Sequence, residues 1–236
     1  MSKAQLHDFF ETAPGMLLHR WEAALMDKIM PEITGKTALQ IACPYAKSLR
    51  SAGHEIKIAL SSDTDELALT HYATNVVADP EHLPFAQESF DLVVMIHALE
   101  FAKDAQALLK EAYRVLAPSG HLIVISLNPW GPWCMKHKHF VGEDCSPMSV
   151  NHLKDAMVGD YFFDNGAFGV YCPSLSDNPN RLATWMWIEK AGDRWWPQFS
   201  NAYMISGVKR VVTPKPVGSV KELFRVSGKF TPEAAS

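Results

Sequence analysis

Residues 77–85 read VADPEHLPF, residues 90–94 read FDLVV, and residues 111–122 read EAYRVLAPSGHL. The first two segments place apolar runs on either side of a proline-containing loop, which is typical of two strands joined by a turn. The third segment ends a helix expected over 104–116, with Asp104 as the N-cap and Pro118-Ser119-Gly120 as the stop. Strand, loop, strand, helix and strand in this order predict the repeating unit of a parallel sheet.

Similar apolar runs lie on both sides of this stretch. Near-continuous apolar runs that alternate with helices indicate parallel strands buried on both faces. We expect strands at 37–42, 56–60, 75–78, 91–96 and 121–127, then a helix at 149–160, a strand at 162–171, a helix at 180–192 and a strand at 202–212. The last two strands are expected to form an antiparallel addition to the sheet.

The chain divides into three parts. Residues 1–35 predict an N-terminal helical lead-in, with helices over 5–11 and 16–30 and a break at Ala13-Pro14-Gly15. Residues 36–212 carry the sheet as one domain. Residues 213–236 have little periodicity and several cations, which predicts a flexible basic tail.

The composition excludes several classes of protein. With 236 residues and a formal net charge of -4, the chain has no global electrostatic reason to bind nucleic acid or an anionic membrane. The first residues lack the order of a secretory signal, and no apolar run approaches the ~20 residues that a membrane helix needs. Four widely spaced cysteines indicate no disulfide framework, so we expect a protein of the reducing cytoplasm.

Together, the three quoted segments resemble the central part of the class I S-adenosylmethionine (SAM) methyltransferase family, whose D-x-x-x-L-P-F step is matched at 79–85. The resemblance spans residues 75–129. It implies an α/β fold: a doubly wound, mostly parallel seven-stranded sheet of the Rossmann-like methyltransferase kind, with N-terminal helices and a C-terminal antiparallel strand pair. It also implies SAM as the cofactor. The segments HALEF at 97–101, NPW at 128–130 and GVKRV at 207–211 are similar to a bacterial, methyltransferase type 11-like branch of cytoplasmic proteins with a degenerate glycine loop.

In such a sheet, ligands bind beyond the carboxyl ends of the strands. The resemblance implies that Asp79 accepts a hydrogen bond from the adenine amine and that Leu83 lies against the adenine face, with His82 as a further candidate beside them. A carboxylate has the acceptor capacity for this contact. Alternatively, Asp79 only begins the turn before Pro80, as Asp-Pro pairs often do, and His82 is a solvated turn residue.

The chain departs from the family pattern after its first two strands. Where the family has an acid and a G-x-G-x-G turn, residues 39–46 read LQIACPYA, so Gln40 and Ala42 are the cofactor candidates there. Glycine matters in that turn because the backbone approaches the cofactor, often with φ values that a Cβ disfavours. Where the family has a ribose-binding acid, the position falls on Leu60 or Ser61, with Asp63 nearby.

His97 and Glu100 close the fourth expected strand on the side where a methyl acceptor would lie, and both are catalytic candidates. His97 is also a cofactor-site candidate, and its imidazole could orient the acceptor or take its proton, because it titrates near neutrality. Methyl transfer can also proceed by alignment alone, in which case His97 only hydrogen-bonds a loop.

Aromatic side chains gather after the fifth expected strand. They predict either a lid over a flat or apolar acceptor or the core of the C-terminal helices, with Trp185 assigned to the core and Trp130 and Trp133 open. Thiols and imidazoles are the ligands that zinc prefers, but the spacing C-x-x-H-x-H-x5-C matches no standard site, so no metal is expected. These zinc candidates are Cys134, His137, His139 and Cys145.

Two functions stay open at this point. The first is a SAM-dependent methyltransferase that acts on an unidentified small-molecule acceptor. The alternative is a non-catalytic methyltransferase-fold protein that serves as a regulatory or partner-binding subunit, which the missing glycines and the missing acid favour. A nucleotide-dependent oxidoreductase is disfavoured because no G-x-G-x-x-G follows the first strand. A small-molecule acceptor and a protein partner are the expected partners; nucleic acid and membrane are not.

Overall fold

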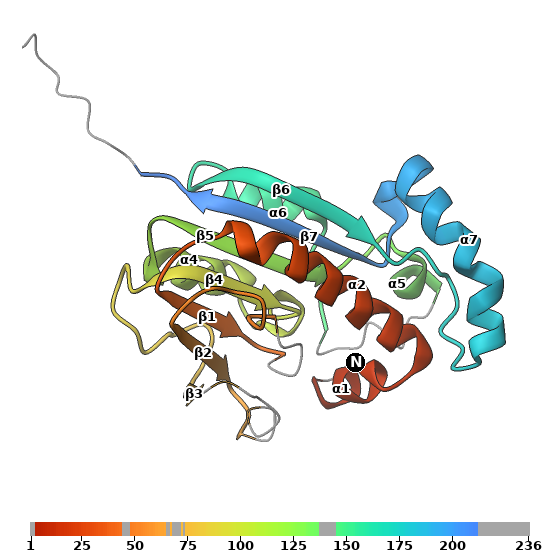
Figure 1. Ribbon diagram of the computed structural model, residues 1–236, viewed down its shortest axis with the longest axis horizontal. Helices are drawn as coiled ribbons and strands as arrows, with labels where there is room; N and C mark the ends of the chain where they lie inside the picture. Colours follow the sequence, from red (N-terminus) through yellow and green to blue (C-terminus); the bar gives the residue numbers. More distant parts are fainter. Residues whose placement is uncertain are drawn as a thin grey trace, which may run out of the picture.

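A seven-stranded sheet runs through the centre of the computed structural model, with helices on both of its faces (Figure 1). The structure describes residues 3–43, 48–64, 67, 72, 74–136 and 145–211. The strands are β1 (Thr37–Ile41), β2 (Ile56–Ser61), β3 (Thr74–Val77), β4 (Phe90–Ile96), β5 (Leu116–Leu127), β6 (Tyr161–Gly169) and β7 (Ala202–Lys209). The α-helices are α1 (Lys3–Phe10), α2 (Ala13–Ile29), α4 (Ala105–Val115), α5 (Pro132–Lys136), α6 (Val150–Met157) and α7 (Pro179–Trp195). The short 3-10 helices are η1 (Met30–Glu32), η3 (Leu99–Phe101) and η4 (Pro197–Phe199).

The strand order is β3-β2-β1-β4-β5-β7-β6. Strands β1 to β5 pair in parallel, whereas β7 is antiparallel to both β5 and β6. This confirms the expected doubly wound, mostly parallel sheet with an antiparallel pair after it. Because β1 lies between β2 and β4, the order of the strands reverses at β1, and crevices for ligands form at such a point.

Several expected element boundaries were wrong, and those of α2 and α4 have clear physical reasons. Helix α2 begins at Ala13, because Thr12 is its N-cap and accepts from the Gly15 amide, while Pro14 lies in the first turn, where no helical hydrogen bond is lost. Helix α4 ends at Val115, before the expected stop at 118–120, because the next residue, Leu116, already pairs with Phe90 in the sheet. Residues 118–120 therefore lie within β5.

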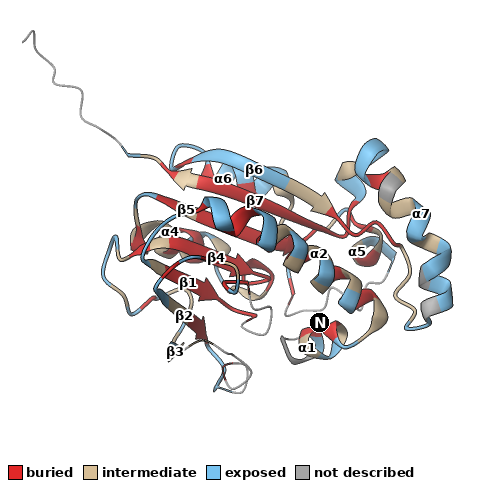
Figure 2. Cartoon of the chain, in the orientation of Figure 1, coloured by how far each residue is buried: buried red, intermediate tan, exposed pale blue. Residues whose placement is uncertain are grey.

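Each face of the sheet carries its own apolar core. Successive strand side chains point to opposite faces, so Leu92 packs with Leu18 and Met26 of α2, while Val93 packs with Leu108 of α4. Leu153 and Met157 of α6 join the second core. Figure 2 shows the central strands buried, and most of α7 and the outer part of β6 exposed.

The division of the chain at residues 35 and 36 stays a prediction, since α1 and α2 pack directly on the sheet that follows them. The tail expected over 213–236 lies outside the described residues. Among the helices that the structure describes, none combines the length and the apolar composition that a membrane span requires.

Candidate functional site

A pocket of about 380 Å³ lies beyond the carboxyl ends of β1, β2, β3 and β4. Each strand contributes a residue that follows its end: Ala42 after β1, Ser62 after β2, Asp79 after β3 and Ala98 after β4. Leu108 of α4 also lines the pocket. The position at the switch of strand order and a volume within the ~300–1,000 Å³ range of small-molecule sites both mark it as the candidate binding site.

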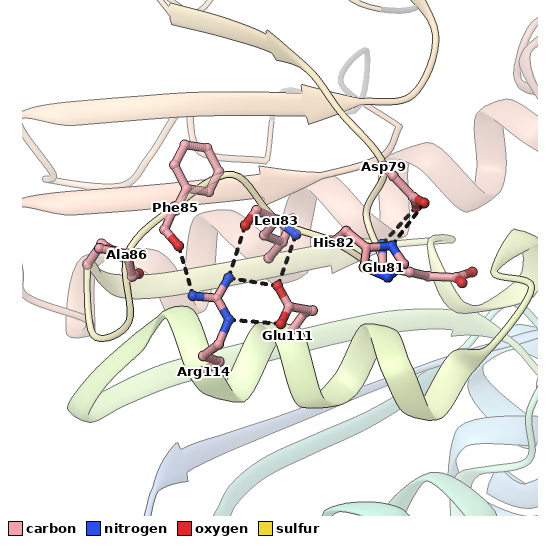
Figure 3. Close-up of polar contacts among 9 residues, drawn as sticks. Asp79, Glu81, His82, Leu83, Phe85, Ala86, Glu111 and Arg114 are labelled. Atoms are coloured by element: carbon pink, nitrogen blue, oxygen red, sulfur yellow. Dashed lines mark hydrogen bonds and ion pairs between the residues drawn. The ribbon is translucent and has the colours of Figure 1, made fainter.

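Asp79 closes the turn at Pro80 and also lines the pocket, while its contact with adenine stays a prediction. One carboxylate oxygen accepts from the Glu81 amide at 3.0 Å, which closes the turn at Pro80, and the other lies 3.2 Å from the Nδ1 atom of His82 (Figure 3). The same residue lines the pocket, and its side chain is 58% exposed. The hydrogen bonds from Glu81 and His82 lower the pKa of Asp79, so its carboxylate is ionised and available as an acceptor at neutral pH.

His82 and Leu83 lie differently from Asp79. The His82 side chain is 82% exposed and faces Asp79. Leu83 is buried in the apolar core beneath α4. Neither is among the described residues that line the pocket, so their contacts with adenine stay predictions.

A paired acid and arginine on α4 hold the loop that follows Asp79. The Arg114 guanidinium donates to both carboxylate oxygens of Glu111 at 2.8 and 2.7 Å. It also donates to the carbonyls of Phe85 and Leu83, and Glu111 accepts from the Leu83 amide at 2.9 Å (Figure 3). Bidentate pairs of this kind fix geometry as well as adding energy. The helix residues Glu111 and Arg114 therefore hold the loop at 83–85 in place.

Glu81 joins the loop after β3 to the loop before α4, and this contact was not identified from the sequence. One of its carboxylate oxygens accepts from the backbone amides of Lys103 and Asp104, at 2.6 and 3.0 Å. Glu81 and Lys103 both line the pocket. A contact across 22 residues between two loops leaves no periodic signal that could have revealed it.

The turn after β1 adopts glycine-like backbone angles without a glycine. Ala42 has φ of 59° and Cys43 has φ of 39°. Gln40 is fully buried, and its amide nitrogen donates to the Cys43 carbonyl at 2.8 Å, while its amide oxygen accepts from the Tyr72 hydroxyl at 2.9 Å. The buried Gln40 side chain thereby stabilises this turn. Its contact with SAM stays a prediction, whereas Ala42 does line the pocket.

Strain at Ala42 predicts a difference between two alanine-to-glycine variants. Both Ala42→Gly and Ala59→Gly remove a buried methyl group, but only Ala42 has a left-handed φ. Because that conformation costs a residue with a Cβ about 1–2 kcal/mol, Ala42→Gly is expected to be about 1–2 kcal/mol more stable than Ala59→Gly. Urea unfolding of the two variants measures this difference, and equal stabilities would contradict the strained turn.

The end of β2 presents a different residue from the two that were expected. Leu60 and Ser61 are both fully buried, and the Ser61 hydroxyl accepts from the Asp63 amide at 3.1 Å. Strand β2 extends through Ser61, one residue further than expected, so Ser62 is the residue that lines the pocket. Ribose contacts from Leu60 and Ser61 stay predictions. Ser62 is a further candidate for contact with the ribose, and it was not identified because the strand was expected to end one residue earlier.

His97 lies at the centre of a buried acid-histidine-acid cluster. Its Nδ1 atom is 2.8 Å from Oε1 of Glu100, and its Nε2 atom is 2.8 Å from Oε1 of Glu22 on α2. The exposed fractions of the His97, Glu22 and Glu100 side chains are 0%, 3% and 0%. Oε1 of Glu100 also accepts from the Leu127 amide at 2.6 Å. The cluster therefore joins α2 to the ends of β4 and β5.

The protonated form of His97 is stabilised in this cluster. Burial by itself lowers the pKa of His97, but the charges of Glu100 and Glu22 outweigh burial and raise it to about 10. Both ring nitrogens contact carboxylates, and Ala98, the next residue, lines the pocket. Direct roles of His97 and Glu100 in catalysis or cofactor binding stay predictions. The contact of Glu22 with His97 was not identified from the sequence, because the two residues are 75 positions apart.

The aromatic residues after β5 differ in how far they are buried. Trp133 is fully buried, whereas Trp130 is 61% exposed. Trp185, which was assigned to the core, is half-buried. Within the described residues, no three His, Cys, Asp or Glu side chains are grouped so as to hold a metal ion, and His137 and His139 lie outside those residues.

Comparison with known proteins finds similarity to one family over the central segment. Residues 39–124 match the family described as methyltransferase domain. The uncharacterized protein YafS of Escherichia coli is 46% identical over 54 residues, which cover 23% of this chain and 22% of YafS. The ubiquinone/menaquinone biosynthesis C-methyltransferase UbiE of Rickettsia felis is 33% identical over 99 residues, which cover 37% of this chain and 40% of UbiE.

The chain thus spans less than half the length of these two curated relatives. Its fold is similar over a longer stretch to the crystal structure of a SAM-dependent methyltransferase from Thermotoga maritima, with a TM-score of 0.60 and 17% identity. That similarity covers 88% of this chain and 95% of the other. Residues 39–124 thus resemble a methyltransferase domain, and the seven-stranded fold resembles that of the Thermotoga maritima protein.

Proposed function

We propose that this protein binds SAM in the pocket at the carboxyl ends of β1 to β4 and transfers its methyl group to a small-molecule acceptor. The observation that carries the proposal is the pocket itself, which opens where the strand order reverses and has the ionised Asp79 carboxylate in its wall. The family of the central segment supports the same function.

The residues around the pocket fit an adenosyl group. Four of the lining residues are alanines, which leave room close to the backbone: Ala42, Ala78, Ala98 and Ala102. Asp79 is held by its own turn with one oxygen toward Glu81, so its carboxylate is already oriented before a ligand arrives. When bound, SAM supplies a methyl group: the lone pair of the acceptor forms the new bond, the electron pair of the broken carbon–sulfur bond stays on sulfur, S-adenosylhomocysteine leaves, and any proton lost by the acceptor passes to solvent.

Each residue of the wall has a separate role in this proposal. Asp79 accepts the adenine amine, and the Ser62 hydroxyl contacts the ribose in place of the missing acid. Ala42 lets the cofactor approach the backbone after β1. His97 and Glu100 act as positioning residues behind Ala98, since the cluster that they form with Glu22 fixes the ends of β4 and β5.

The non-catalytic alternative loses its main support. It rested on the absent glycines and on the absent ribose-binding acid; the first ground is weakened because Ala42 and Cys43 adopt left-handed φ values without glycine, with Gln40 holding the turn. A quinol ring is the first acceptor class to assay, because the partial likeness to UbiE supports it.

Calorimetric titration of the full chain with SAM and with S-adenosylhomocysteine tests the proposal. Binding in the micromolar range is expected, and Asp79→Ala should weaken it by about 10- to 100-fold, because a hydrogen bond to a charged group contributes about 1.5–3 kcal/mol. Asp79→Asn keeps an oxygen that can accept from the Glu81 amide, so the turn is retained, but it removes the negative charge. If this variant also binds SAM more weakly, the loss is due to adenine binding and not to collapse of the loop.

Asp193→Ala is the matched control, since Asp193 is exposed on α7 and does not line the pocket. This variant should bind SAM as the unmodified protein does. The absence of heat at millimolar SAM, or unchanged affinity in both Asp79 variants, would refute the proposed site.

A further inference from the structure

A second pocket of about 570 Å³ lies at the same edge of the sheet, beyond β5 and β6. Asn128 follows the end of β5, Phe168 lies near the end of β6, and Phe199 precedes β7, and all three line this pocket. Val150 at the start of α6 lines it as well. The first pocket is lined by Leu108 of α4 and the second by Val150 and Lys154 of α6, and both helices pack in the second apolar core, so both pockets lie at the carboxyl edge of the sheet beside that core.

The wall of this second pocket is aromatic and exposed. Trp130 is 61% exposed and Phe199 is 51% exposed, although both are large apolar side chains. Exposed aromatic groups that converge on a concave surface mark binding sites rather than ordinary surface. They offer flat faces against which a ring or an apolar body of a ligand can stack.

Hydrogen bonds hold this wall in place before any ligand binds. The side-chain nitrogen of Asn128 donates to the carbonyls of Gln198 and Ser200, at 2.8 and 2.9 Å. The side-chain oxygen of Asn128 accepts from the Trp130 amide at 3.1 Å. The loop after β5 and the loop before β7 are thereby fastened to each other, which reduces the ordering cost of binding.

The second pocket has a single charge in its wall. Of the described residues that line it, Lys154 on α6 is the only ionisable one. Lys154 is exposed, and no carboxylate in the described part of the chain lies within ion-pair distance of it. An unpaired ammonium beside aromatic faces is complementary to a ligand that is itself aromatic and negatively charged.

We propose that this second pocket is the acceptor site and that it selects an aromatic small molecule carrying one anionic group. The ring lies between Trp130 and Phe199, and the anionic group pairs with the Lys154 ammonium. The acceptor role rests on the proposed methyltransferase function, because the nucleophilic atom must reach toward the neighbouring pocket for SAM. The selection of an aromatic anion is a binding property that can be measured without turnover.

Two fluorescent probes test the binding property. One is anilinonaphthalene sulfonate, which has an aromatic body and one anionic group, and the other is phenylnaphthylamine, the same body without the sulfonate. Both are titrated into the full chain in the presence of S-adenosylhomocysteine. The anionic probe is expected to bind the unmodified protein more tightly, and Lys154→Gln should weaken it about 3- to 10-fold without changing the affinity for the neutral probe.

Three further variants make this result specific. Phe199→Ala should weaken both probes, because it removes a stacking face that lines the pocket. Two variants serve as controls: Lys28→Gln replaces a lysine on α2, and Trp187→Ala removes an exposed indole on α7. Neither residue lines the pocket. Both of these controls should leave the two affinities unchanged. An unchanged ratio of the two probe affinities in Lys154→Gln would overturn the proposal.

The acceptor role has its own assay. Labelled SAM is incubated with aromatic carboxylic acids that also carry a hydroxyl group and with their methyl esters. The hydroxyl oxygen forms the new bond to the methyl group and loses its proton to solvent, and the acids are expected to be methylated there in preference to the esters. Lys154→Gln should raise KM for an acid with little change in kcat, and equal use of acids and esters would overturn the assignment. If SAM gives no binding heat while the probe result stands, the methyltransferase proposal and the acceptor role fail, and only the preference of the second pocket for an aromatic anion survives. If SAM binds but the probe ratio is insensitive to Lys154, the acceptor-site proposal alone fails.

Discussion

Replacement of His97 by alanine is expected to lower the free energy of unfolding by about 3–5 kcal/mol at pH 7, as removal of one member of a buried ion cluster does. The physical reason is that the two carboxylates now held by the ring, those of Glu22 and Glu100, would be left buried with no cation between them. Both are almost fully excluded from water. Urea unfolding followed by tryptophan fluorescence and by circular dichroism measures the loss.

Two variants separate the charge from the loss of a side chain. His152→Ala removes an exposed histidine on α6 and should change stability by less than about 0.5 kcal/mol. Glu22→Gln keeps the size of the side chain and leaves His97 paired with Glu100, so its loss should be much smaller than that of His97→Ala. A His97→Ala variant as stable as the unmodified protein would show that no such ion cluster exists in solution.

The same cluster predicts how stability depends on pH. The pKa of His97 lies at about 10 in the folded protein, above its ordinary value of 6.5, so the folded state binds the proton more tightly than the unfolded state. The stability that this proton contributes is complete below about pH 6.5 and is lost as the pH rises toward 10. His97→Asn should abolish this dependence.

The measurement is best confined to pH 6 to 8.5. Burial also raises the pKa of Cys134 and of Cys145 to about 12, from an ordinary value of 9.0, and this adds a loss of the same sign at higher pH. His19 lies beside the cluster, with its Nδ1 atom 3.9 Å from Oε2 of Glu22, and is partly exposed. His19→Gln is therefore the control, and the pH dependence should persist in it.

Gln40→Glu is expected to destabilise the protein by about 2–4 kcal/mol at pH 7.5, although the resemblance to the family places an acid at this position. The amide nitrogen of Gln40 donates to the Cys43 carbonyl at 2.8 Å, and a carboxylate oxygen in its place would meet another acceptor in a fully buried site. The Tyr72 hydroxyl can satisfy only the other oxygen. The strained turn at Ala42 and Cys43 would lose its support.

The loss in Gln40→Glu should diminish as the pH falls. A buried carboxyl that must donate to a carbonyl is protonated more readily when folded, so its folded pKa is raised and stability returns at acid pH. Urea unfolding at pH 7.5 and at pH 5 measures this. Gln106→Glu, an exposed change in the first turn of α4, is the matched control and should be neutral or slightly stabilising. Equal behaviour of the two variants would contradict the role assigned to Gln40.

Local spacing in the sequence was enough to predict the central fold. Asp104 does cap α4, accepting from the amides of Gln106 and Ala107, because a cap depends only on residues two and three positions away. The apolar runs became buried strands in the expected order, with the antiparallel pair after them. The place of Asp79 beside the pocket also followed from the rule that ligands meet the carboxyl ends of parallel strands.

The sequence by itself therefore determined the order of the strands, the cap of α4 and the turn from Asp79 to Glu81, because these depend on periodicities and hydrogen bonds within a few residues. Only the tertiary structure decided that Glu22 meets His97 across 75 residues, since this contact depends on how α2 packs against the sheet. It also decided that Ala42 and Cys43 take left-handed backbone angles, because distant groups such as Tyr72 hold Gln40 in place beneath them. Contacts between segments far apart in the chain carry no local pattern, and their energies are defined only once the core has brought those segments together.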